Sequence, residues 1–293
     1  MAYLLLLLTT LLWGGNGVAG KLAVGHVSPM LLTSLRWGLA FLILWLLGRG
    51  RLRADWAALR PHLPLLALLG FLGFSLFNIA LYAALLFTTA VNTSIEQAGI
   101  PMLIFGLNFL LFRQRVAWGQ AVGFSLAVAG VALTASHGSL DRLLALDVNF
   151  GDALMLVAVL AYALYTVLLR FRPAVHWLSL MVVLTGAATL TSLPFAIGEA
   201  ALGHMIQPDG QGWAVVAYTV LFPSILAQIF FIRGVELIGA NRAGLFVNLV
   251  PIFGTLLSIL ILNEAFHLYH AAALAMVLGG IALAEWSGKR MAA

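Results

Sequence analysis

The residues that could bind a small molecule in this chain are polar or aromatic side chains that lie inside long apolar stretches. A polar group there costs free energy unless it finds a partner or a water-filled cavity. Several of these residues are three or four positions apart, which places them on one face of a helix. Their similar depth predicts a central amphipathic cavity; the alternative is that the amides only bond neighbouring helices to each other. The cavity candidates are Trp13, Asn16, Asn78, Tyr82, Glu96, Gln97, Tyr162, Tyr165, Gln228 and Asn248.

Glu96 is the most informative of these candidates because it is an acid inside an apolar stretch. A carboxylate about two turns inside a bilayer does not stay ionised without a partner. Three roles remain open for Glu96: it exchanges a coupling proton, it binds the ammonium group of a substrate, or it is a protonated structural side chain.

Three basic residues also fall in or beside apolar stretches. Arg36 and Lys21 could attract anionic groups of a substrate, but we expect them to extend to lipid headgroups or to pair with carbonyls at helix C-termini. Arg233 is expected to anchor its helix at the membrane interface.

Two prolines and two glycines are candidates for hinges. Pro101 and Pro251 lie in the middle of apolar stretches, where a proline removes a backbone hydrogen bond and permits a kink. Carbonyls freed at such a break can line a site. Gly14 and Gly15 could act in the same way, and close helix packing is the alternative for them.

Enzymatic and cofactor-dependent functions have no support in the sequence. The chain has no cysteine, which excludes thiolate metal sites. His267 and His270 are three residues apart, but no third ligand lies at a matching depth, so we expect no metal site. The phosphate-binding Gly-Lys-Ser/Thr loop is missing as well. We therefore expect no catalytic residues, no metal and no cofactor.

The elements that position these residues are transmembrane helices. Hydrophobic residues make up 63% of the 293 positions and charged residues 9%, against about 25% charged in a soluble domain. A helix needs about 20 apolar residues to cross a bilayer. The sequence predicts an all-α integral membrane protein whose ten spans are approximately 3–20, 29–48, 64–87, 90–112, 117–136, 150–169, 177–197, 213–236, 240–262 and 268–286.

The distribution of basic residues predicts the orientation of these spans. The net charge is +5, but the basic residues lie in short gaps between apolar stretches and not on an aromatic-rich face, so we expect lipid and not nucleic acid as the partner. Lys and Arg concentrate in cytoplasmic loops. The gaps after the odd-numbered spans hold only Lys21 and Arg142. We expect a multi-pass protein of the plasma membrane, the inner membrane in a bacterium, with both termini in the cytoplasm. The gaps after the even-numbered spans and the C-terminus hold Arg49, Arg51, Arg53, Arg60, Arg113, Arg115, Arg170, Arg172, Arg242, Lys289 and Arg290.

An internal repeat divides the chain into residues 1–136 and 149–288. A shift of 150 residues places Pro101 on Pro251 and Ala90 on Ala240. Each half holds five predicted spans, and an odd number means that the second copy enters the membrane in the opposite direction. Inverted repeats are typical of secondary transporters, whose substrate site lies near the membrane midplane between the halves.

Three groups of motifs also resemble the EamA branch of the drug/metabolite transporter superfamily. The first group is Leu12-Trp13-Gly14-Gly15-Asn16-Gly17 with Lys21, and the second is Pro29 with Leu35-Arg36-Trp37 and Ala40. The third is Asn263-Glu264 with Gly279-Gly280. One departure is Arg113-Gln114-Arg115, where the family often has a Glu. The resemblance implies ten helices in two inverted five-helix repeats around a central cavity.

The same resemblance implies an exporter of amino acids, including aromatic and other neutral ones, or of similar small metabolites. It would work by alternating access, with a coupling proton as a further partner. A drug or nucleotide-sugar carrier of the same superfamily is the alternative, although a phosphate-bearing substrate would need several inward-facing cations. A membrane-embedded enzyme or a structural subunit would need a catalytic constellation or a large partner surface, and the sequence shows neither.

Overall fold

The computed structural model describes residues 1–113, 118–139 and 149–292, and in these ranges it contains helices and no strands. Arg115 and Arg142, which enter the charge count, and Gln114, where the family often has a Glu, lie outside the described residues. The first half of the chain forms α1 (Ala2–Leu22), α2 (Pro29–Leu59), η1 (Arg60–His62), α3 (Leu63–Gly70), η2 (Phe71–Leu76), α4 (Phe77–Ala84), α5 (Ala90–Gln97), α6 (Ile100–Phe112) and α7 (Trp118–Ala135). The second half forms α9 (Phe150–Leu168), η3 (Leu169–Phe171), α10 (Trp177–Ala201), α11 (Gly210–Leu221), η4 (Phe222–Leu226), α12 (Ala227–Ile238), α13 (Ala240–Val247), α14 (Val250–Leu262) and α15 (Leu268–Ala292).

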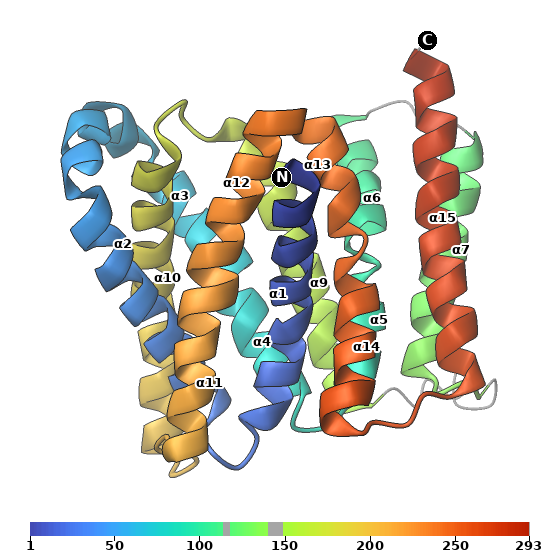
Figure 1. The fold of residues 1–293 in the computed structure, drawn as a ribbon, viewed down its shortest axis with the longest axis horizontal. Helices are drawn as coiled ribbons and strands as arrows, with labels where there is room; N and C mark the ends of the chain where they lie inside the picture. Colours follow the sequence, from blue (N-terminus) through green and yellow to red (C-terminus); the bar gives the residue numbers. More distant parts are fainter. Residues whose placement is uncertain (114–117, 140–148, 293) are drawn as a thin grey trace.

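The chain is a multi-pass membrane protein. Among the described residues, 8 helical stretches are long and apolar enough to cross a membrane, and the longest of them is the 56-residue stretch Pro29–Ala84. A shorter apolar helix covers Leu268–Ala284. The helices lie roughly side by side, and both termini are at the same end of the bundle (Figure 1). We call this end the terminal end and the other one the far end.

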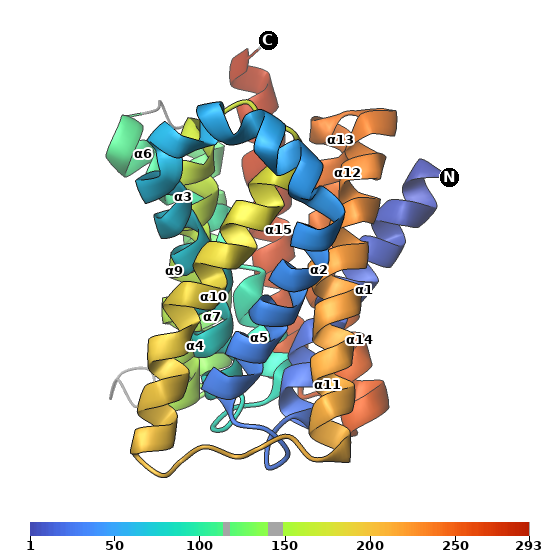
Figure 2. The same ribbon diagram turned by 90° about the vertical axis from the view of Figure 1, so that its left-hand side faces the viewer.

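The segment Arg49–His62 is helical for most of its length, and the prediction of a loop there was wrong. α2 continues to Leu59, well past the predicted end of the second span. Leu, Ala and Arg are good helix formers, so the helix persists beyond the apolar stretch. The chain reverses near η1, and α3 runs back alongside α10 (Figure 2).

Four irregular backbone segments occur in two pairs, and each pair has one member in each half of the chain. η2 and η4 are π-helical. A break separates α5 from α6, and a second one separates α13 from α14. Pro101 and Pro251 lie in the first turn of α6 and α14, directly after these breaks and not in a helix interior as predicted. A first-turn proline is well tolerated because its missing N–H would have no partner in the helix.

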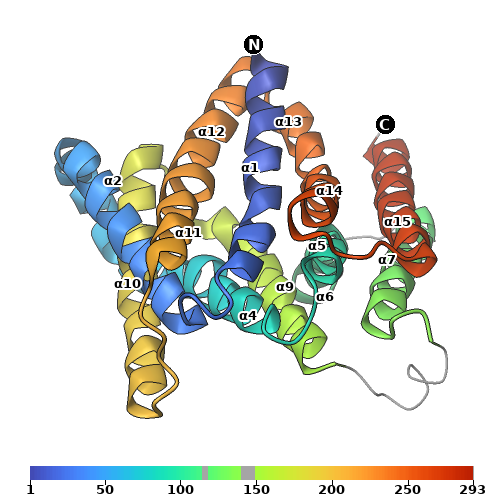
Figure 3. The same ribbon diagram turned by 60° about the horizontal axis from the view of Figure 1, so that its bottom comes forward.

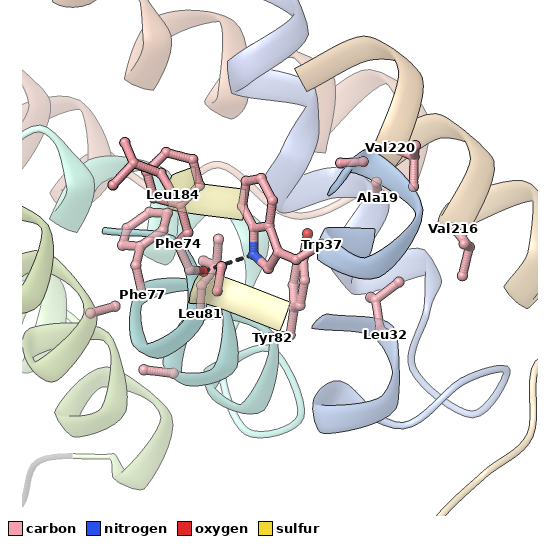
Figure 4. Packing of buried hydrophobic residues seen from close by; sticks show 14 of the residues in the cluster. Ala19, Leu32, Trp37, Phe74, Phe77, Leu81, Tyr82, Leu184, Val216 and Val220 are labelled. Atoms are coloured by element: carbon pink, nitrogen blue, oxygen red, sulfur yellow. Dashed lines mark hydrogen bonds between the residues drawn. The ribbon is translucent and has the colours of Figure 1, made fainter. Parts of the chain in front are cut away.

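The main hydrophobic core lies where α2, η2, α4 and α10 meet. Trp37 of α2 packs against Phe74 of η2 with a centroid distance of 4.7 Å, and Leu81 and Leu184 are fully buried beside them (Figure 4). The indole Nε1 of Trp37 donates a 2.9 Å hydrogen bond to the carbonyl of Phe74. This bond uses a carbonyl of the π-helical segment and fixes η2 against α2.

α7 and α15 pack closely along each other at one side of the bundle (Figure 3). Gly123 of α7 and Gly280 of α15 form the closest point: a Cβ added to either one would lie 2.4 Å from the carbonyl oxygen of the other. Small residues permit such close contact of membrane helices, where packing and not hydrophobicity drives association.

Gly280→Ala should therefore lower the melting temperature of the purified protein in detergent, because the added methyl group forces two backbones apart. Overpacking of this kind costs about 1–3 kcal/mol. The matched control is Gly279→Ala, since an added Cβ at the adjacent position meets nothing within 4 Å. Equal melting temperatures for the two variants would contradict the close contact of α7 and α15.

Candidate substrate cavity

A cavity of about 320 Å³ lies near the centre of the bundle. Small-molecule sites usually have volumes of about 300–1,000 Å³, so this cavity is at the lower end of that range. Eight of the ten predicted residues lie in its wall, and they come from both halves of the chain. They are Trp13, Asn16, Asn78, Gln97, Tyr162, Tyr165, Gln228 and Asn248.

All four irregular backbone segments border this cavity. Gly73 and Phe74 belong to η2, Pro223 belongs to η4, and Ala98 and Asn248 lie at the two helix breaks. Pro101 and Pro251 also line it. π-helical segments and broken helices leave backbone groups outside the regular hydrogen-bond ladder, and membrane proteins use them where a site must be built.

Arg36 is at the centre of a buried hydrogen-bond network at the cavity wall. Its Nε donates to Ser224 Oγ at 2.8 Å, and its Nη1 donates to Asn16 Oδ1 at 2.8 Å and Asn78 Oδ1 at 2.7 Å. Nη1 also donates to the hydroxyl of Tyr82, which in turn donates to Asn16 Oδ1 at 2.9 Å. The network joins α1, α2, α4 and η4, which places residues from both halves of the chain around one guanidinium.

The guanidinium of Arg36 has polar partners but no counterion. The side chain is 5% exposed, and no carboxylate of the described residues lies within 4.0 Å of it. No described residue accepts a hydrogen bond from Nη2. A buried cation without a carboxylate is costly, so an anionic ligand at this point of the wall would relieve that cost.

Arg36 does not extend to the headgroups, and that prediction was wrong. One feature of the sequence does indicate that Arg36 is buried: it is the only charged residue in the apolar stretch 29–48. For Lys21, one of the two expected alternatives was pairing with carbonyls at a helix C-terminus. Its Nζ donates to Leu85 O and Thr88 O at 2.8 Å, just after α4, which agrees with that alternative. Arg233 forms an exposed ion pair with Glu236 at 2.7 Å.

Aromatic rings form much of the remaining wall. Trp13 packs against Phe231 with a centroid distance of 5.3 Å, and its Nε1 donates to Pro223 O at 3.1 Å. Tyr162 lies 5.1 Å from Phe77 and 5.4 Å from Tyr165 between ring centroids. The cavity therefore offers a flat apolar surface beside the cation of Arg36.

Tyr82 and Glu96 are the two predicted residues that do not line the cavity. Tyr82 is 1% exposed and lies behind Asn16, which it supports through its hydroxyl group. Glu96 is 0% exposed on α5, which packs against α9, the helix that carries Asp152. The residues after Glu96 turn toward the cavity, because Gln97 and Ala98 line it at the end of α5.

Gly14 and Gly15 serve helix packing in this structure. α1 is continuous from Ala2 to Leu22 and has no break at the glycines. A Cβ at Gly14 would lie 2.7 Å from the backbone nitrogen of Gly254, and one at Gly15 would lie 2.2 Å from the Tyr218 hydroxyl. The packing alternative therefore accounts for both positions.

A second hollow lies next to the cavity, on the side of the terminal end. It has a volume of about 900 Å³, shares the wall residues Ile104 and Thr166 with the cavity and includes Arg170 and Arg172. Arg170 lies in η3, which directly follows α9, and Arg172 comes directly after η3. On the opposite side lies the Arg36 network, since Arg36 is two turns from the far end of α2 and Tyr82 is two residues before the far end of α4. The cavity thus lies between the second hollow on the side of the termini and the Arg36 network on the far side.

Fold and cavity together define a membrane transporter with a central site between helices, and comparison with known proteins agrees. The sequence profile described as the EamA-like transporter family matches residues 1–136 and 149–286. The chain belongs to the EamA-like transporter family.

Several similar proteins are named as uncharacterized transporters. YetK of Bacillus subtilis is 30% identical over 281 residues, which are 96% of this chain and 85% of the relative. A transporter of Archaeoglobus fulgidus is 28% identical over 275 residues, 89% of each chain. A solved crystal structure superposes with a TM-score of 0.65 over 100% of this chain and 99% of the other at 21% identity, which shows a shared fold.

The Tyr82 hydroxyl should contribute to stability through the Arg36 network. Tyr82→Phe removes a buried hydroxyl that accepts from Arg36 and donates to Asn16, so it should destabilise the protein by about 1–3 kcal/mol and lower its melting temperature without substrate. Tyr162→Phe is the control, because Tyr162 lines the cavity and takes no part in the hydrogen bonds found around Arg36 in the described residues. A Tyr82→Phe protein as stable as the control would show that the network contributes little.

Proposed function

We propose that this transporter exports amino acids, aromatic and other neutral ones included, across the plasma membrane by alternating access. The proposal includes ten spans with both termini in the cytoplasm. The 56-residue stretch Pro29–Ala84 contains two spans because the chain reverses at η1, and α15 adds the tenth (Figure 2). The observation that carries the substrate class is Arg36, a buried guanidinium in the wall of an aromatic cavity with no counterion among the described residues.

The chemistry of the cavity matches the parts of an amino acid. A carboxylate can accept hydrogen bonds from the Arg36 fork, and arginine–carboxylate pairs are among the strongest polar contacts in proteins. The amide oxygens of Gln97 and Gln228 can accept hydrogen bonds from the ammonium group. In Gln97 the Nε2 already donates to Thr93 O at 3.2 Å, which leaves its Oε1 available as an acceptor. Trp13, Tyr162 and Tyr165 provide a surface for an apolar side chain.

A nucleotide sugar fits this cavity less well. Arg36 is the only charged residue in the described wall, whereas a pyrophosphate group needs several cations or backbone amides to offset its charge. A cationic drug would place a second positive charge beside Arg36 in a low-dielectric site, which is repulsive. The single guanidinium therefore favours a substrate with one carboxylate.

Matching elements in the two halves support an inverted repeat. α6 and α14 each have 13 residues, and α5 and α13 each have 8. Arg113 and Asn263 directly follow α6 and α14, with positive φ angles of 51° and 53°. α5 and α13 start 150 positions apart in the sequence, and so do α6 and α14. Motion of one repeat against the other would open the site alternately to each side.

Substrate binding can be coupled to this motion through Arg36. In the present state Nη1 of Arg36 donates to Asn16, Asn78 and Tyr82, and these bonds close the far side. A substrate carboxylate would compete with these neutral acceptors for the guanidinium. Binding would thereby weaken the contacts that must separate for the far side to open, and only a ligand with differential contacts in the two states can shift their equilibrium.

Arg36→Gln should remove the preference for a carboxylate. In proteoliposomes, the wild type should exchange labelled phenylalanine much faster than phenethylamine, which lacks the carboxylate. Loss of a charged hydrogen bond of about 1.5–3 kcal/mol corresponds to about a 10- to 100-fold loss of this preference. The ratio of the two substrates does not depend on the fraction of folded protein.

Two further variants make the result interpretable. Arg233→Gln neutralises an exposed arginine and should leave the ratio at the wild-type value. Arg36→Lys keeps the charge but loses the bidentate fork, so an intermediate ratio is expected. An unchanged ratio in Arg36→Gln would overturn the assignment of the carboxylate site.

A further inference from the structure

A second buried polar cluster lies outside the cavity, toward the far end of the bundle. Its central members are Glu96 of α5 and Asp152 in the first turn of α9, and both side chains are 0% exposed. Neither carboxyl lines the substrate cavity. The cluster is thus separate from the cavity, but one of its members lies on α5, the helix whose end lines the cavity.

All four oxygen atoms of the two carboxyl groups are buried, and none has a partner at full hydrogen-bond geometry among the described residues. The side chains of Thr88 and Asn92 lie beside the Asp152 carboxyl, and no such neighbour is found for Glu96 in the described residues. The helices that carry Glu96 and Asp152, α5 and α9, pack against each other. Two carboxylates buried at one helix contact cannot both be ionised in a low-dielectric environment, so the pair needs at least one positive species to be stable. A proton is the smallest species that fits an enclosed site.

One histidine connects the pair to the far end. His137 Nε2 lies 3.6 Å from Asp152 Oδ2, and its side chain is 29% exposed. His137 follows α7 at the far end of the bundle, so its ring reaches both the solvent and the buried pair. An imidazole is suited to pass protons because it ionises near neutral pH.

The other titratable groups around α5 are already engaged. Lys21 of α1 bonds two carbonyls, and Glu264 accepts from Ala90 N at 2.9 Å and Val91 N at 2.8 Å at the start of α5. His270 of α15 pairs with Asn92 at 3.0 Å, and its Nδ1 accepts from the backbone nitrogen of His267 at 3.0 Å. None of these groups forms an ion pair with Glu96 or Asp152 in the described residues.

The pair can act on the cavity through α5. Glu96 is followed directly by Gln97 and Ala98, which line the cavity, and by the break before α6. When the pair holds a proton, α5 can pack against α9 as it does here. Loss of the proton leaves a buried negative charge without a partner, which favours a shift of α5 and therefore of the cavity wall.

We propose that Glu96 and Asp152 form the proton-binding site that couples export to the proton gradient, with His137 as its connection to the outside. A proton from the outer solution binds to His137 Nε2, moves to a carboxylate oxygen of Asp152 and is shared with Glu96. Each transfer breaks one N–H or O–H bond and forms another. The proton leaves to the cytoplasm after the substrate has been released outside. This inference rests on the proposed function, because it needs a transported substrate to which the proton is coupled.

The test uses the full chain in proteoliposomes with both termini exposed to the lumen, loaded with labelled phenylalanine. Two measurements are made: exchange against unlabelled phenylalanine at equal pH, and efflux with the outside about one pH unit more acidic. If one proton is exchanged per substrate, that gradient can support a concentration ratio of phenylalanine across the membrane of about tenfold. The wild type should respond to the gradient, while Glu96→Gln and Asp152→Asn should show no response although their exchange remains measurable.

Three more variants decide between coupling and structure. Glu96→Asp keeps a titratable carboxyl and should keep the response, and His137→Gln should reduce it. Glu236→Gln removes an exposed carboxylate outside both sites and should respond like the wild type. A full response in Glu96→Gln, or a wild type that exchanges phenylalanine without responding to the gradient, would overturn the proton site and leave the proposed function intact. A wild type without exchange would overturn both.

Discussion

The guanidinium of Arg36 is the group on which the arrangement of this transporter depends. It lies in the interior of a membrane protein and takes its acceptors from α1, α4 and η4. Moving such a charge out of water is expensive, and neutral amides and hydroxyls only partly offset that cost. α2, which carries Arg36, and the three elements that provide its acceptors therefore pack around the guanidinium. The wall of the cavity is formed where these four elements meet. The same incomplete compensation leaves a place for an anionic ligand.

The irregular helices follow from the same constraint. A continuous α-helix uses all of its backbone groups internally and presents only side chains to a cavity. In this protein η2, η4 and the two helix breaks interrupt the ladders at the level of the cavity. Ser224 of η4 accepts a hydrogen bond from Arg36, and the carbonyl of Pro223 accepts one from Trp13. Hydrogen bonds and aromatic packing thus hold the interrupted segments in place, and the breaks provide points about which parts of the bundle can move.

In the proposed mechanism, one polar site binds the substrate and the other binds the coupling proton. The cavity has one cation and an aromatic wall, whereas Glu96 and Asp152 are two acids with only His137 close to one of them in the described residues. α5 belongs to both sites, because it carries Glu96 in a buried position and ends with Gln97 in the cavity wall. The cavity at one end of α5 calls for an anionic ligand, and the acids around Glu96 call for a proton. Because one short helix contributes to both sites, it would couple proton binding to amino-acid binding in the proposed mechanism.

The sequence predicts much of the fold and of the cavity because their signals are local. Apolar stretches of sufficient length define helices, and Asn16, Asn78 or Gln228 stand out against such a background without knowledge of their partners. The role of Arg36 could not be predicted, because it depends on Ser224, which lies 188 positions away along the chain. Likewise, the side of α5 to which Glu96 points depends on the position of α9, and the packing role of Gly14 depends on Gly254. The helical continuation of α2 to Leu59 is not predicted by hydropathy, because charged residues interrupt the apolar stretch there while the helix persists.

The central claim is that an amino acid binds in this cavity from the side of the termini, and the absence of native cysteine permits a direct measurement. Ile104 lines both the cavity and the hollow at the terminal end. In Ile104→Cys, a membrane-impermeant thiol reagent should react from the cytoplasmic side, and phenylalanine but not phenethylamine should slow the reaction. Reaction only from the outer side, or equal protection by both compounds, would contradict the account.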